Sequence, residues 1–207
     1  MLTLNPAYIS AQSQENSSKV APSPNGSFEA KGSRFLGFLV LVREFESVLK
    51  TLRATHLKAV HFVYAYRELL PNGQILERSS DDGEPKGSSG ISVLNVLRGW
   101  EMIDCGVIVV RYFGGTLLGI GGLVRAYTNA TKNSLIAAQN DHLLITYEPQ
   151  EMLTIHSSYA NLRALHYKLK LLNIIIDKEE FLGDEVIVHI RGAKDKLEKI
   201  SGLTFRG

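Results

Sequence analysis

The sequence predicts an α+β protein made of two domains, and three observations lead to this prediction. The chain of 207 residues is long enough for one large domain or two small ones. Short apolar runs typical of strands alternate with segments in which apolar residues recur every three or four positions, as in helices. This pattern begins again near Asn140–His142. We therefore expect a flexible N-terminal arm over residues 1–26, a first domain over 27–142 and a second domain over 148–207.

The arm is rich in Ser, Asn, Gln and Pro, and turn-forming residues end it at Pro22–Gly26. In the first domain, Phe45, Leu49 and Leu52 lie on one helical stripe. Asn72-Gly73 is a strong hairpin signal. The run 106–110 is continuously apolar, as in a central strand that is buried on both faces. In order, we expect strands over 35–42, 59–66, 74–77 and 106–110, with helices over 44–56, 91–100 and about 122–139.

The second domain repeats the alternation on a smaller scale. A strand over 152–156 is followed by a helix over 161–172 with leucines on one face. Strands over 174–179 and 185–190 form a hairpin, and a helix covers 194–200. This strand–helix–strand–strand–helix order suggests a ferredoxin-like domain, with a short last strand over 203–205.

Composition excludes several classes of protein. No apolar run is long enough to cross a bilayer, and the N-terminus lacks the layout of a signal peptide. The lone Cys105 lies in an apolar run, which indicates a small buried thiol and a cytoplasmic protein. A net charge of +2 is too small to indicate a polybasic nucleic-acid binder, so any such contact needs a local patch.

The segment Arg111–Tyr127, RYFGGTLLGIGGLVRAY, is the first candidate site. Glycine-rich loops that open a helix leave backbone N–H groups free to bind an anion. The alternative is a tight loop that needs glycine for its geometry, beside an ordinary solvated helix face. Basic and aromatic residues also alternate here, as in single-strand binding sites, although at least half of the aromatic residues should belong to the core. The candidate anion or RNA contacts are Arg111, Tyr112, Gly114, Gly115, Gly121, Gly122, Arg125, Asn129 and Lys132.

A second candidate is the acidic loop Ser79–Gly90, SSDDGEPKGSSG. Asp81, Asp82 and Glu84 could hold a hard cation or supply a general acid, with His61 nearby. They could also form a solvated turn. We favour a third interpretation, in which Asp81 or Asp82 pairs with Arg111 or Arg125 and ties the two loops together. Ser88 and Ser89 are expected to cap the helix that follows.

The sequence contains no pattern of metal ligands and no activated nucleophile. His61 is by default a hydrogen-bonded structural histidine. We therefore expect no catalytic residue, no metal and no cofactor.

The two loops together resemble the IMPACT/YigZ family, in its bacterial form with a second domain. The matching segments are Ser33-Arg34-Phe35, the strand 59–65, Ser80–Pro85 and Arg111–Tyr127. Two positions depart from the family pattern: Val63 stands where Cys is usual, and Leu117 stands where Lys is usual. The resemblance implies a first domain like ribosomal protein S5 domain 2, followed by the ferredoxin-like domain. It also implies a role in translational control, since eukaryotic relatives bind a regulator of a stress kinase.

Three functions follow as hypotheses. We favour a non-catalytic binding protein that associates with RNA or the ribosome and regulates translation. The alternatives are an enzyme on a small anionic or phosphorylated substrate, using Asp81, Asp82 or Glu84 with His61, and a protein–protein adaptor.

Overall fold

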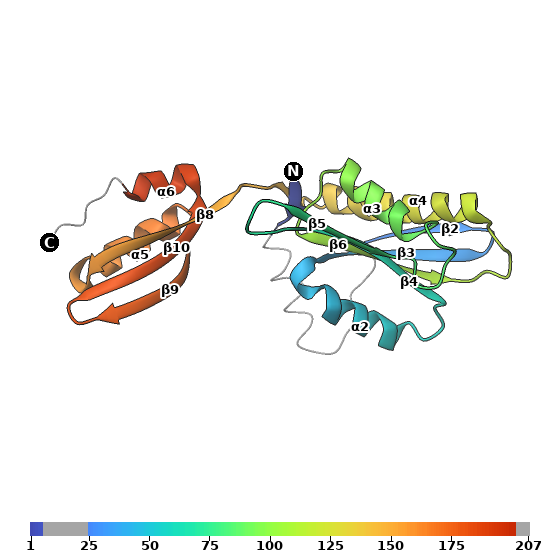
Figure 1. Ribbon diagram of the computed structural model, residues 1–207, viewed down its shortest axis with the longest axis horizontal. Helices are drawn as coiled ribbons and strands as arrows, with labels where there is room; N and C mark the ends of the chain where they lie inside the picture. Colours follow the sequence, from blue (N-terminus) through green and yellow to red (C-terminus); the bar gives the residue numbers. More distant parts are fainter. Residues whose placement is uncertain (6–24, 202–207) are drawn as a thin grey trace. The chain divides into compact units, whose positions relative to one another are not determined.

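The structure is a computed structural model that describes residues 1–5 and 25–201. Contacts within the chain divide it into two compact units, Met1–Tyr147 and Glu148–Gly207. Both units combine helices with antiparallel sheets, so the α+β class is confirmed (Figure 1).

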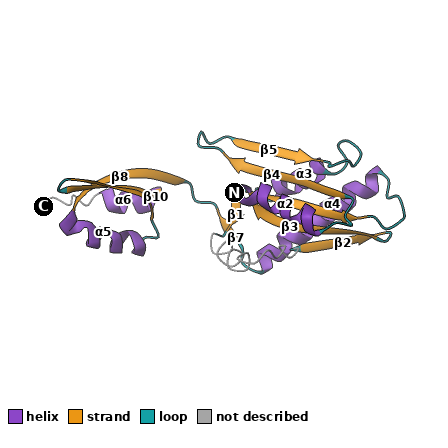
Figure 2. Cartoon of the chain, turned by 90° about the horizontal axis from the view of Figure 1, so that it is seen from below, coloured by secondary structure: helices purple, strands orange, loops and turns teal. Residues whose placement is uncertain are grey.

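A five-stranded antiparallel sheet forms the middle of the first unit. Its order is β2 (Gly26–Ala30), β3 (Ser33–Leu41), β6 (Cys105–Tyr112), β4 (His61–Leu69) and β5 (Ile75–Ser80). Figure 2 shows β5 and β2 at the two edges of this sheet. The apolar run 106–110 lies in the central strand β6 and is buried throughout, as its sequence predicts.

Helices cover both faces of the sheet. Helices α3 (Gly90–Gly99) and α4 (Ile120–Asn140) lie on one face, and α2 (Phe45–Thr55) lies on the other (Figure 1). The alternation along β4 explains the two cores, because Val63 packs with the α3–α4 side while Phe62 packs with the α2 side. Both positions lie in the segment 59–66, which was predicted as a strand.

The expectation of a flexible arm is wrong for the first residues. β1 (Leu2–Leu4) pairs antiparallel with β7 (Leu144–Thr146), and Leu4 is buried in the core beneath α3 and α4. Residues 6–24, the rest of the expected arm up to Pro24, lie outside the described residues. Strand β2 was also not predicted, since its sequence GSFEA carries only one large apolar residue.

The second unit has a three-stranded antiparallel sheet in the order β8-β10-β9. Its elements are β8 (Gln150–Ser158), α5 (Tyr159–Leu171), β9 (Ile175–Leu182), β10 (Glu185–Ala193) and α6 (Lys194–Ser201). The predicted order of elements is confirmed, and leucine, isoleucine and valine side chains from α5, α6 and β10 form its core. The expected strand over 203–205 lies outside the described residues.

Cys105 is buried at the start of β6, as expected for a structural thiol. Burial, and then the charge of Asp104, raises the pKa of this thiol to about 12, so it stays protonated near neutral pH. Within the described part of the chain, no helix has the length and apolar character needed to cross a membrane.

Candidate binding site

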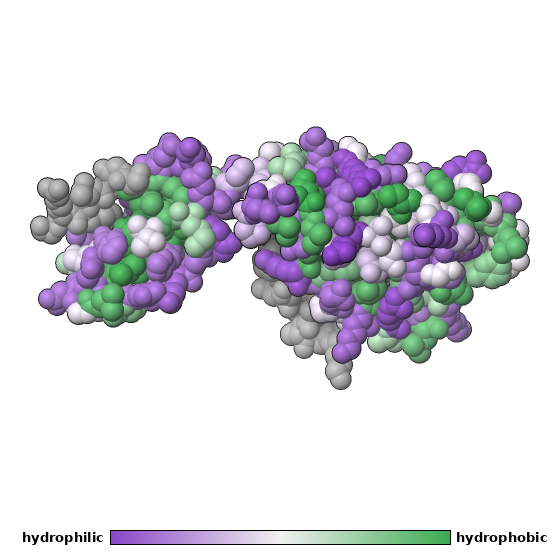
Figure 3. Space-filling model, viewed as in Figure 1, coloured by the Kyte–Doolittle hydropathy of each residue, from purple (hydrophilic) through white to green (hydrophobic). Residues whose placement is uncertain are grey.

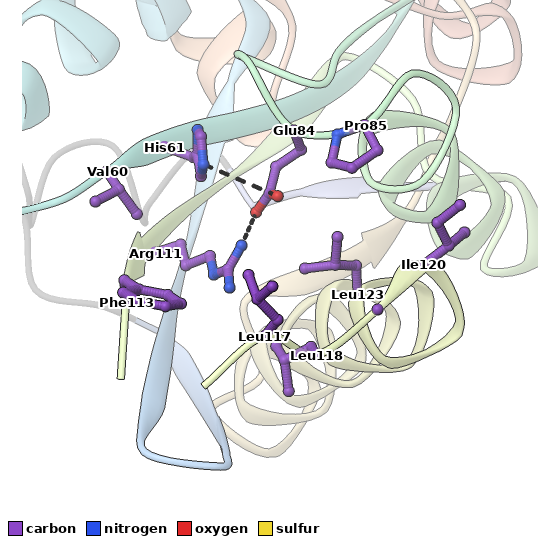
Figure 4. A pocket seen from close by; sticks show the side chains of 11 residues that line it. Val60, His61, Glu84, Pro85, Arg111, Phe113, Leu117, Leu118, Ile120 and Leu123 are labelled. Atoms are coloured by element: carbon purple, nitrogen blue, oxygen red, sulfur yellow. Dashed lines mark hydrogen bonds and ion pairs between the residues drawn. The ribbon is translucent and has the colours of Figure 1, made fainter. Parts of the chain in front are cut away.

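A pocket of about 400 Å³ opens where β6 leads into the glycine-rich loop and α4 begins (Figure 4). It brings together residues from both loops singled out in the sequence and from the start of β4. The residues that line it are Val60, His61, Glu84, Pro85, Arg111, Phe113, Leu117, Leu118, Gly119, Ile120 and Leu123. Most of this lining is apolar, whereas the sequence predicted a cationic loop.

The polar floor of the pocket is a buried ion pair between Arg111 and Glu84. Arg111 Nη1 donates to Glu84 Oε1, and Tyr127 donates its hydroxyl to the same oxygen over 2.7 Å. Burial, and then the neighbouring Glu84 charge, raises the pKa of Tyr127, so its hydroxyl remains a donor. The favoured prediction that Asp81 or Asp82 pairs with Arg111 or Arg125 is therefore wrong. Glu84 is the partner of Arg111, and Arg125 forms no ion pair with the described residues.

Arg111 lies between two aromatic rings. Its Cζ is 5.4 Å from the centre of the Phe35 ring and 5.7 Å from that of Phe113. The Arg111 residue is 4% exposed, and its Nε is buried without a hydrogen-bond acceptor among the described residues. Most buried polar atoms in proteins have a partner, so this one marks a place where an acceptor is missing.

His61 completes the floor. Its Nδ1 lies 2.8 Å from the carbonyl oxygen of Asp82, and its Nε2 lies 3.9 Å from Glu84 Oε2. A carbonyl oxygen can only accept, so Nδ1 carries the proton and Nε2 of the neutral ring is an acceptor. The default reading of His61 as a hydrogen-bonded histidine is confirmed, and its free nitrogen lies at the pocket (Figure 4).

Exposed apolar side chains form the rim of the pocket: Val60, Phe113, Leu117 and Ile120. Leu117 is 82% exposed and Ile120 is 65% exposed. Figure 3 shows hydrophobic patches among hydrophilic side chains on the viewed face of this unit. This rim was not predicted from the sequence. The available signal was the run of apolar residues between glycines, where no neighbouring element can cover them.

Asp81 and Asp82 hold the acidic loop in place. The Asp81 carboxylate accepts hydrogen bonds from the backbone N–H groups of Gly87, Ser89 and Gly90. Asp81 therefore caps α3, and the expectation that Ser88 and Ser89 cap it is wrong, since no side-chain cap bond comes from Ser89.

Asp82 has different hydrogen-bond partners from Asp81. Its carboxylate accepts from Phe62 N and from Arg53 Nη2, both over 2.6 Å. Asp81, Asp82 and Glu84 thus point to three different sets of partners and do not form the cation site that was considered. Across residues 1–5 and 25–201, no three His, Cys, Asp or Glu side chains are grouped as metal ligands.

Replacing Asp81 with alanine should lower the free energy of unfolding by about 1–2 kcal/mol at pH 7, because three N–H groups lose their acceptor. Burial would raise the pKa of Asp81, but the three backbone hydrogen bonds outweigh it and lower the pKa. The stabilisation is therefore present above the unfolded-state pKa and is lost as pH falls through the lower folded-state pKa.

Urea unfolding of the wild-type and Asp81→Ala proteins between pH 7 and pH 2.5 measures this difference. Asp141→Ala is the control, since Asp141 is exposed and makes no side-chain hydrogen bond with the described residues. A difference between wild type and Asp81→Ala that stays constant down to the lowest pH would contradict the capping role.

The glycines of the loop have different reasons to be glycine. A Cβ on Gly114 would lie 1.9 Å from the carbonyl carbon of Gly32, so the loop needs glycine where it meets the β2–β3 turn. Gly115 and Gly119 have φ of +83° and +70°, a region that other residues rarely adopt. A Cβ on Gly121 would meet nothing within 4 Å, whereas one on Gly122 would lie 3.0 Å from Leu118 Cβ, which is a tight contact. At positions 114, 115 and 119 the local structure therefore requires glycine whether or not a ligand binds.

The remaining predicted contacts do not line the pocket. Tyr112 points to the other face of the sheet, where its hydroxyl lies 2.6 Å from His56 Nδ1. Arg125 and Lys132 are exposed on α4, and Asn129 is half-buried. Lys132 lines a second hollow of about 430 Å³ between α3 and α4, together with Trp100. Of the nine predicted binding residues, only Arg111 is among those that line the first pocket.

Fold and pocket together define a two-unit α+β protein with an apolar-rimmed pocket on its amino-terminal unit. The Impact N-terminal domain family matches residues 31–135, just over half of the 207 residues, and the chain belongs to this family. The resemblance seen in the motifs is thereby confirmed.

Several relatives carry the same family name. An IMPACT family member of Haemophilus influenzae is 37% identical over 110 residues, covering 52% of this chain and 53% of the relative. The IMPACT family member YigZ of Escherichia coli is also 37% identical over 110 residues, covering 52% and 54%. A Protein IMPACT homolog of Dictyostelium discoideum is 36% identical over 110 residues, covering 51% and 31%. The match thus spans about half of each bacterial relative.

One solved structure is similar over most of the chain. A crystal structure described as that of a hypothetical protein has a TM-score of 0.66 and 28% identity, over 88% of both chains. The two departures from the family pattern now have places in the fold. Val63 is buried in the core, and Leu117 stands on the pocket rim.

Proposed function

We propose that the chain is a regulatory binding protein without catalytic activity, and that it holds a protein partner at the pocket beside α4. The carrying observation is the exposed apolar rim, in which Leu117 and Ile120 are mostly exposed around a buried ion pair. Exposed apolar patches of this kind mark protein contacts on soluble proteins. Membership of a family that includes eukaryotic Protein IMPACT homologs fits a regulatory role, and we place that role in translation.

We propose further that each of the two units is a module with a known fold. We assign the first to the fold of ribosomal protein S5 domain 2 and the second to the ferredoxin-like fold. The element orders of both units agree with these assignments.

RNA is the second candidate partner. The observation that favours it is the pair of exposed cations on α4, Arg125 and Lys132, for which the described residues supply no ion-pair partner. The pocket itself gives RNA less support, since Arg111 is buried and neutralised by Glu84. An enzyme also has less support, because the carboxylates of Asp81 and Asp82 already bind backbone N–H groups or Arg53.

Placing a photo-crosslinking amino acid at position 117 should capture a protein from cell lysate, and the captured band should survive nuclease treatment. The same amino acid at position 57 is the matched control, since Leu57 is also 82% exposed and lies outside the pocket. With the purified partner, Leu117→Asp should raise the Kd about tenfold or more because an apolar contact is lost. Leu57→Asp should leave the Kd unchanged.

Two results would contradict the proposal. Equal capture from positions 117 and 57 would mean that the rim is not an interface. Loss of the captured band after nuclease treatment would favour RNA, and binding should then weaken with added salt and with Arg125→Ala or Lys132→Ala.

A further inference from the structure

The floor of the pocket contains a hydrogen-bond donor that lacks an acceptor. Arg111 Nη1 donates to Glu84, but Nε is buried and unpaired among the described residues. The half-exposed ring of Phe113 lies over the guanidinium and also lines the pocket, so a ligand would reach Nε by displacing it. An acceptor placed there would satisfy an N–H that water does not reach.

Two acceptors face each other beside this donor. His61 Nδ1 donates to the Asp82 carbonyl, so in the neutral ring Nε2 is the acceptor that faces the pocket. Glu84 Oε2 lies 3.9 Å from that nitrogen, which is beyond hydrogen-bond distance. The floor therefore offers one unused donor and two acceptors that could share a donor.

Charge favours a neutral ligand. Arg111 and Glu84 cancel each other's charge on the pocket floor. A phosphate or carboxylate would bring a further negative charge next to Glu84 and among Pro85, Leu118 and Leu123, where it would lose its hydration. An uncharged group with both a hydrogen-bond donor and an acceptor matches the pocket floor. An apolar group attached to it matches the apolar side chains that line the rest of the pocket.

We infer that the pocket seats one residue of an extended, hydrophobic peptide segment through its main-chain N–H and C=O, which point to the same side of an extended chain. The carbonyl of this residue accepts from Arg111 Nε, and its N–H donates to Glu84 Oε2 or His61 Nε2. The apolar side chain of this residue packs against Leu117 and Ile120. This inference rests on the proposed function and specifies its chemistry. A volume of about 400 Å³ suits a short segment, since small-ligand pockets begin near roughly 300 Å³.

The test titrates the ¹⁵N-labelled full chain with N-acetyl-leucine N-methylamide and follows the Nε–H signals of the arginines. The Arg111 signal should move downfield and saturate. The Arg67 signal is the internal control and should not move, because Arg67 Nε already donates to Glu77 over 2.9 Å. Leu117→Asp should weaken the binding about tenfold, and Leu57→Asp should not change it.

Three further probes separate the alternatives: N-acetyl-leucine with a free carboxylate, inorganic phosphate and uridine. A stronger response to either anion than to the amide would overturn the inference in favour of an anion site. A stronger response to uridine would overturn it in favour of an RNA base. No response of Arg111 to any probe would also overturn it.

If position 117 still captures a protein partner, the proposed function would stand while this inference fails. If the Arg111 signal responds saturably to the amide but no protein is captured at position 117, this inference would hold and the proposed protein partner would be wrong.

Discussion

Replacing Glu84 with glutamine is expected to lower the free energy of unfolding of the amino-terminal unit by about 3–5 kcal/mol. The substitution keeps the shape of the side chain but leaves Arg111 as a buried charge without a counter-charge, since both side chains are at most 5% exposed. Tyr127 can still donate to the glutamine oxygen, so the loss reports the ion pair. Urea unfolding at pH 7 measures it, with the midpoint and slope compared between the two proteins.

Glu29→Gln is the matched control, because it removes the same charge from an exposed pair with Arg34. That pair is expected to contribute about 0–1 kcal/mol. Equal stability of the Glu84→Gln and Glu29→Gln proteins would mean that the buried pair does not stabilise the fold.

Replacing Gly114 with alanine should be the second large effect, with a loss on the order of 3 kcal/mol. The new Cβ would lie 1.9 Å from Gly32 C and 2.2 Å from Ser33 N, so backbone must move. The movement would also break the hydrogen bond from Gly114 N to Ser33 Oγ, which joins the loop to the β2–β3 turn. Thermal unfolding followed by circular dichroism measures the change.

Gly121→Ala, seven residues further along the chain, is expected to stabilise the protein, in contrast to Gly114→Ala. Gly121 lies in the first turn of α4, and a Cβ there would meet nothing within 4 Å. Alanine should therefore stabilise the helix by up to about 0.5–1 kcal/mol. A loss of stability in both variants would show that the loop tolerates no side chain for a reason other than close packing.

Much of the fold could be predicted from local patterns. The continuous apolar run 106–110 identified the central strand, and the segment 59–66 was recognised as a strand whose side chains enter both cores. Strands β1 and β2 could not be found in this way. β1 has three residues and depends on pairing with Leu144–Thr146, far away in sequence, and β2 carries only Phe28 as a large apolar side chain.

The site was predicted as two loops that meet, and its details were not. The choice among three nearby carboxylates depends on the turn at Asp82 and Gly83, whose φ values are +43° and +88°. This turn sends Glu84 towards Arg111 and leaves Asp81 at the start of α3. Residue spacing alone does not indicate such a turn. The apolar rim was missed because the prediction for this loop rested on its glycines and cations and not on Leu117 and Ile120.

The ladder between β1 and β7 has a consequence for folding during synthesis. A ribosome releases Leu2–Leu4 early, but their partner strand Leu144–Thr146 emerges only after the five-stranded sheet and α4 have been made. Leu4 belongs to the core beneath α3 and α4, so that core stays incomplete until then. The amino-terminal unit can therefore close only after residues 144–146 have left the ribosome, and a nascent chain that ends before residue 144 should remain sensitive to protease.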